Sequence, residues 1–86
     1  MDQISERAIS VRMPIRNHQP GMPFFVDYVV DVHGASDDPR FDLSKQVGGA
    51  EPVCLGNFRT FAEAQIAADQ DYGEKISGNR WREDQG

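Results

Sequence analysis

The segment FFVDYVVDVH, residues 24–33, indicates the fold most strongly. Neighbouring side chains of a β-strand point to opposite sides of the sheet, so alternate residues share a face. One side of this segment is wholly apolar and carries Phe24, Val26, Tyr28, Val30 and Val32. The other side is mixed and carries Phe25, Asp27, Val29, Asp31 and His33. The pattern predicts a strand of an antiparallel sheet with one face on the core and the other on water.

Three weaker strand patterns accompany this segment. Residues 8–13 alternate, and Pro14 ends that strand or places it at the edge of the sheet. Residues 41–47 alternate as well, and residues 53–58 form a short apolar run. Residues 34–39 are typical of a long turn, and Gly48 with Gly49 of a flexible reversal. We therefore expect the strands within residues 24–58 to form a meander.

One helix is predicted over residues 60–77. Thr60 and Glu63 have the spacing of a capping box, in which each side chain accepts a hydrogen bond from the helix start. An apolar stripe follows at helical spacing: Phe61, Ala64, Ala68, Tyr72 and Ile76. Gly73 marks close packing or an early end, and Gly78 suits the residue after the helix. Asp69 and Asp71 are expected to be solvated, and residues 79–86 are a polar tail.

The expected fold class is α+β, with an antiparallel sheet of three or four strands and one C-terminal helix packed on one face. The whole chain, residues 1–86, forms one small domain, since 86 residues are too few for two cores. Residues 1–23 hold the N-terminal strand and a Pro-rich loop, and the strand joins the sheet or exchanges with a neighbouring chain. So small a core favours tight packing, a partner or self-association.

Composition limits the classes of protein that this chain belongs to. The net charge of −5 has the wrong sign for a general phosphate-backbone binder. A single cysteine excludes an internal disulfide framework and a self-contained cysteine-rich zinc site. The apolar runs are far shorter than the roughly 20 residues of a membrane span, and the first residues do not resemble a secretory signal. We therefore expect a cytoplasmic protein without a membrane partner.

Residues 55–64, LGNFRTFAEA, resemble a strand–turn–helix junction of two DNA-binding families. These are the ethylene-response-factor domains of plants and the arm-binding domains of phage integrases. The run is also similar to small uncharacterised phage and proteobacterial proteins. The resemblance implies a three-stranded sheet backed by a helix, and in those two families the exposed sheet face reads DNA with Arg and Trp. Here the long strand offers Asp27 and Asp31 instead, which repel phosphate.

Two groups of residues are weighed as centres of chemistry. Asp31, His33, Asp37 and Asp38 have side chains that suit a divalent cation, but they also suit a strand end and a solvated turn. Cys54 needs a base to act as a nucleophile, and only His18 and His33 are available. A buried structural thiol is the ordinary alternative for Cys54. We expect no enzyme, no cofactor and no metal site.

Two surfaces are candidates for binding a partner. Arg80, Trp81 and Arg82 have side chains that often anchor interfaces, although Trp81 also suits the core of its own domain. The mixed face of residues 24–33 is the other candidate: Phe25, Asp27, Val29, Asp31 and His33. That face is an interface, is covered by the N-terminal segment, or is simply exposed. Apolar groups rimmed with acids favour a basic protein as partner.

The sequence thus favours a non-catalytic, acidic protein-interaction module. The resemblance suggests a small bacterial or phage accessory or regulatory protein, or an inhibitor of a basic target. A homo-oligomer is a further expectation. Two alternatives stay open. One is a nucleic-acid-binding module of the integrase-arm type that uses Arg7, Arg12, Arg16, Arg59, Arg80 and Arg82. The other is a metal-dependent enzyme built on His33.

Overall fold

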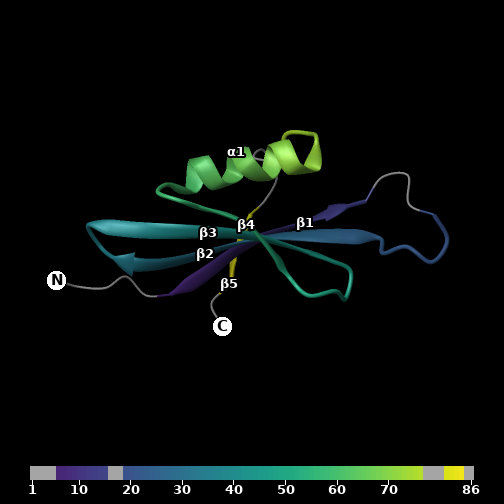
Figure 1. The fold of residues 1–86 in the computed structure, drawn as a ribbon, viewed down its shortest axis with the longest axis horizontal. Helices are drawn as coiled ribbons and strands as arrows, with labels where there is room; N and C mark the ends of the chain where they lie inside the picture. The colour runs from purple at the N-terminus through teal and green to yellow at the C-terminus, as the bar shows by residue number, and fades with distance from the viewer. Residues whose placement is uncertain (1–5, 16–18, 77–80, 85–86) are drawn as a thin grey trace.

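A five-stranded antiparallel sheet with one helix along one side makes up the fold (Figure 1). The computed structural model describes residues 6–15, 19–76 and 81–84. The elements, in chain order, are β1 (Arg7–Pro14), β2 (Phe25–Ala35), β3 (Asp38–Val47), β4 (Val53–Phe58), α1 (Phe61–Tyr72) and β5 (Arg82–Asp84). The strand order across the sheet is β4-β3-β2-β1-β5. The predicted α+β class with a C-terminal helix on one face is confirmed.

The sheet has more strands than the three or four that were predicted. The meander of β2, β3 and β4 is confirmed, since consecutive strands are neighbours. The N-terminal strand β1 pairs with β2 of its own chain along its whole length. It is not an edge strand, because β5 pairs with residues 8–10 on its other side. Pro14 lies at the end of β1, opposite Phe25, where it interrupts no further pairing.

The core lies between α1 and the apolar side of β2. Val26, Tyr28, Val30 and Val32 are at most 5% exposed, and Leu43 of β3 is fully buried beside them. Ala64 and Ala68 are the helix residues with no exposed surface, so small side chains let α1 lie close to the sheet. Phe24 was predicted to share this face but is 63% exposed, because it precedes β2.

The β2–β3 hairpin is tighter than the long turn predicted over residues 34–39. β2 continues to Ala35 and β3 begins at Asp38, so only Ser36 and Asp37 connect them. Gly34 permits this, because its φ of 102° is a conformation that residues with a Cβ rarely adopt. A Cβ on Gly34 would also lie 2.9 Å from the carbonyl oxygen of Asp38. Residues 34, 35, 38 and 39, which were predicted to lie in the turn, are therefore paired between β2 and β3.

Helix α1 begins as predicted and ends earlier. The Glu63 amide donates to Thr60 Oγ1 at 3.1 Å, and Glu63 Oε2 accepts from the Arg59 amide at 3.3 Å. Gly73 adopts a left-handed φ of 88° and donates to the Asp69 carbonyl, which ends the helix at Tyr72 rather than at residue 77. Gly78, the predicted end signal, lies outside the described residues. No described helix has the length and apolar character needed to cross a membrane.

Candidate functional site

The side of the sheet away from α1 is the first candidate, and we call it the open face. It is formed by side chains that alternate with the buried ones, and no other described element packs on it. Its members include Ala8, Ser10, Arg12, Phe25, Asp27, Val29, Asp31, His33, Arg40, Asp42, Ser44, Cys54, Asn57 and Arg82. The predicted mixed face of β2 is thus part of a wider surface. The described N-terminal segment, β1, extends this surface and does not cover it.

A groove crosses one end of the open face. It has a volume of about 730 Å³ and is lined by Ser10, Val11, Arg12, Met13, Pro14, Phe25, Asp27 and Arg82. The Arg12 guanidinium lies 5.5 Å from the centre of the Phe25 ring, which is cation–π range. It also donates to both oxygens of Asp27, at 2.9 and 3.3 Å. Phe25 is nevertheless 47% exposed, so the groove presents an aromatic ring beside the ion pair of Arg12 and Asp27.

Acidic side chains gather at the opposite end of the open face. Asp31 and Asp42 lie directly across from each other on β2 and β3, an arrangement in which like charges repel. His33 Nε2 lies 2.6 Å from Asp42 Oδ2, and the Asn57 amide donates to the other oxygen of Asp42. His33 and Asn57 thus form hydrogen bonds with the carboxylate of Asp42 but not with that of Asp31. Among the described residues, no side chain pairs with the Asp31 carboxylate.

Asp42 should make the stability of the fold depend on pH. Burial alone would raise the pKa of Asp42, but hydrogen bonds from His33 and Asn57 lower it below its ordinary value of 3.8. The stabilisation is therefore complete above 3.8 and is lost as the pH falls through the lower pKa of the folded state. Urea unfolding over this range should show stability falling more steeply for wild type than for Asp42→Asn. Equal slopes would contradict the assignment.

Arg80, Trp81 and Arg82, which were predicted to form one surface anchor, do not form a single group in the described structure. Trp81 is half-buried and packs edge-on against Phe61, with ring centres 5.5 Å apart, so it belongs to the core side. Arg82 lies in β5 opposite Ser10 and lines the groove of the open face. No described side chain pairs with its guanidinium. Arg80 lies outside the described residues.

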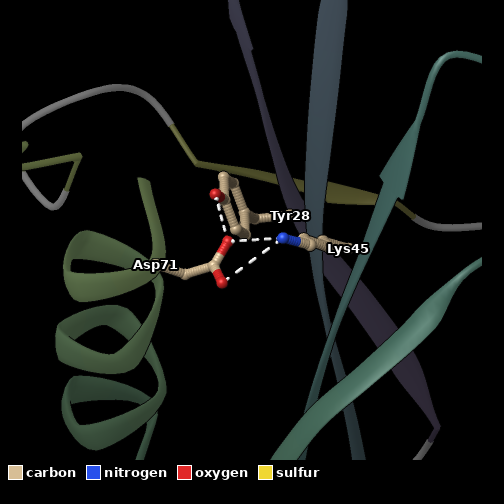
Figure 2. Close-up of polar contacts among 3 residues, drawn as sticks. All are labelled: Tyr28, Lys45 and Asp71. Atoms are coloured by element: carbon tan, nitrogen blue, oxygen red, sulfur yellow. Dashed lines mark hydrogen bonds and ion pairs between the residues drawn. The ribbon is translucent and has the colours of Figure 1, made fainter. Parts of the chain in front are cut away.

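A polar cluster on the helix side joins α1 to the sheet (Figure 2). Asp71, near the end of α1, accepts from the Tyr28 hydroxyl at 2.8 Å and from Lys45 Nζ at 3.1 and 3.4 Å. Tyr28 comes from β2 and Lys45 from β3, so one carboxylate ties the helix to two strands. Asp71 is therefore not simply solvated, as predicted. Asp69 also differs from the prediction, since it accepts from the Ile76 amide at 2.6 Å.

An open cleft of about 520 Å³ lies beside this cluster. It is lined by Ile15, Val26, Tyr28, Lys45, Val47, Asp71, Tyr72, Gly73 and Glu74. Burial, followed by the hydrogen bond to Asp71, raises the pKa of Tyr28 far above its ordinary value, so the hydroxyl keeps its proton. Lys45 and Asp71 neutralise each other. The cluster therefore serves as a clamp for the helix rather than as an acid–base pair.

The residues considered for chemistry do not come together. Cys54 is exposed, whereas a buried thiol was expected, and it lies opposite Ser44 on the open face. His33 lies opposite Arg40 of β3, whereas Cys54 lies opposite Ser44 of the same strand. Arg40 and Ser44 are four residues apart, so His33 and Cys54 are offset by roughly 13 Å along the strands. His18 lies outside the described residues. Within the described ranges, no three His, Cys, Asp or Glu side chains are placed to hold one metal ion.

The arginines weighed for nucleic-acid binding lie on different surfaces. Arg12 and Arg82 share the groove, where Arg12 is already paired with Asp27. Arg7 points to the helix side and pairs with Glu83 at 3.3 Å. Arg59 is exposed just before α1. Arg16 and Arg80 lie outside the described residues.

The clamp of Tyr28, Lys45 and Asp71 was missed at the level of sequence, although two signals pointed to it. Tyr28 falls on the apolar side of β2, where a buried hydroxyl needs an acceptor. Lys45 alternates in register with Phe41, Leu43 and Val47, so its ammonium group also required a partner near the core. The pairing of His33 with Asp42 had no such signal, because it depends on the register of the β2–β3 hairpin.

Comparison with known proteins finds no matching family model and no similar curated protein or solved structure. The resemblance of residues 55–64 to integrase-arm and ethylene-response-factor domains therefore stays a prediction. So does the suggested bacterial or phage origin.

Proposed function

We propose that this chain is a non-catalytic protein-interaction module and that its open face is the docking surface. One observation carries the proposal: Phe25 is 47% exposed and, with half-buried Val29, lies on a sheet side that no other described element covers. Exposed apolar groups bordered by charges are typical of protein interaction sites. The other side of the sheet already packs on α1.

The charges of the open face specify the kind of protein that would dock. Its groove end carries Arg12 and Arg82 against one carboxylate, Asp27. Its hairpin end carries the acids Asp31, Asp38 and Asp42, with Arg40 as the one arginine among them. A basic partner, as the sequence favours, fits the hairpin end alone. A partner that covers the whole face needs cations at one end and anions at the other.

Replacing Phe25 with aspartate should abolish docking. The substitution removes the exposed ring and puts a charge into the centre of the groove, and buried unpaired charges weaken interfaces strongly. The matched control is Ile66→Asp, since Ile66 is 55% exposed on the outer side of α1. Immobilised wild type, F25D and I66D are incubated with an extract of the cells that make the protein. We expect wild type and I66D to retain the same protein and F25D to lose it by about tenfold or more.

Two results would contradict the proposal. Equal retention by F25D and wild type would place the docking surface elsewhere. Binding of a short DNA duplex that weakens steeply with salt would favour the nucleic-acid alternative. Circular dichroism of each variant shows that the fold is intact before binding is compared.

A further inference from the structure

Among the side chains that the structure describes, two charged groups of the open face have no partner. Arg12 is paired with Asp27, His33 with Asp42, and Arg40 with Asp38. Asp31 and Arg82 remain, and no described side chain is within hydrogen-bond or ion-pair distance of either one. They carry opposite charges. On β2, Asp31 is the next open-face residue after Val29 in the direction of the β2–β3 hairpin. Arg82 is level with Val29 but lies two strands from β2, on β5.

The strip between these two groups is small and uncharged. Only β1 separates Arg82 of β5 from Asp31 of β2, and its open-face residues there are Ser10, opposite Arg82, and Ala8, opposite Asp31. Two sheets that pack face to face lie about 10 Å apart, which requires side chains of this size between them. The arrangement thus has a close-packing centre with a free cation to one side and a free anion to the other.

A surface of this kind is complementary to itself. A two-fold axis lying in the interface between two identical faces exchanges the ends of the pattern. Each Arg82 then meets the Asp31 of the other copy, and the pair forms twice. Stacking without this exchange would bring like charges together, which is unfavourable.

We propose that the partner on the open face is a second copy of this chain, with Arg82 of each copy paired to Asp31 of the other. This inference rests on the open face being the docking surface. Small side chains and two exposed ion pairs would form the contact, so we expect a weak dimer of the class that buries less than about 1,200 Å². Because exposed ion pairs hold it, raised salt should weaken it.

Light scattering over a concentration series at low salt tests the proposal. Wild type should rise from 9.6 kDa to twice that mass, and added salt should reverse the rise. Asp31→Arg and Arg82→Asp should each stay monomeric or bind at least about tenfold more weakly, because each turns both pairs into like charges. The double variant D31R/R82D restores opposite charges, so it should dimerise again.

Matched controls separate a charge effect from a loss of structure. Glu51→Arg and Arg59→Asp make the same changes of charge at exposed positions away from the open face. They should dimerise as wild type does. Circular dichroism should be unchanged in all variants, since Asp31 and Arg82 are exposed.

Each other outcome overturns a defined part of the account. A wild-type mass of 9.6 kDa at every concentration would overturn the second copy as partner, while face-dependent capture of another protein would still support the proposed function. A dimer unaffected by D31R and R82D would place the self-association interface elsewhere and overturn this inference, while the capture experiment with F25D would still decide the proposed function. A double variant that stays monomeric would overturn the Arg82–Asp31 pairing.

Discussion

Replacing Tyr28 with alanine should lower the melting temperature of the chain by at least about 12 °C. Tyr28 is 2% exposed, packs edge-on against Tyr72 at 6.2 Å and donates its hydroxyl to Asp71. Truncating a buried aromatic side chain costs about 3–5 kcal/mol, and each kcal/mol corresponds to roughly 4–8 °C in a domain of this size. The total stability expected for such a chain is only about 4–13 kcal/mol. Calorimetry of wild type and variant measures the change.

Two further variants separate the causes of this loss. Tyr28→Phe keeps the ring and removes only the hydroxyl, so it should cost about 1–3 kcal/mol through the lost bond to the Asp71 carboxylate. Ile66→Ala also truncates a large side chain, but Ile66 is exposed and its removal should change stability by less than about 0.5 kcal/mol. A Tyr28→Ala variant as stable as Ile66→Ala would contradict the position of Tyr28 in the core.

Replacing Trp81 with alanine should destabilise the fold by about 2–3 kcal/mol and loosen β5. A fully buried Trp costs about 3–5 kcal/mol on truncation, and Trp81 is only half-buried against Phe61. β5 has three residues, so the packing of Trp81 beside it contributes much of what holds it to β1. Hydrogen exchange should therefore rise at residues 8–10, which pair with β5.

The Trp81 variant also decides between the two roles predicted for this side chain. Lost stability with docking retained in the folded fraction would support the core role. Unchanged stability with lost docking would make Trp81 an anchor for a partner and contradict its placement here. Arg59→Ala, a truncation at an exposed position outside the core, provides the comparison.

The central part of the fold follows from local patterns. The alternation of residues 24–33 is sufficient to place Val26, Tyr28, Val30 and Val32 in the core, because a period of two leaves them on one side of any strand. Thr60 and Glu63 likewise fix where α1 begins, since capping involves residues only three apart. These features need no knowledge of the rest of the chain.

Features that depend on distant pairings were not predicted. β5 is three residues long with no alternation to identify it, and it became visible only where it pairs with β1. The same pairing places β1 inside the sheet, where the sequence had left open whether Pro14 marks an edge strand or only the end of a strand. Asp71 was assigned to solvent because its helix neighbours gave no partner, whereas its partners Tyr28 and Lys45 come from strands at least 26 residues away. The sequence predicted which residues of β2 form the mixed face. Which of their charges are paired depends on the register with β1 and β3, which the sequence pattern does not give.

Photo-crosslinking from Cys54 tests the central claim, that the open face is the docking surface, most directly. Cys54 is the single cysteine of the chain and is exposed on that face, so a thiol-reactive benzophenone can be attached to it alone. Irradiation of the labelled protein at high concentration, and again in an extract of its own cells, should give a covalent adduct with itself or with another protein. The adduct should disappear with Phe25→Asp and persist with Ile66→Asp. No adduct, or the same adduct from all three proteins, would contradict the claim.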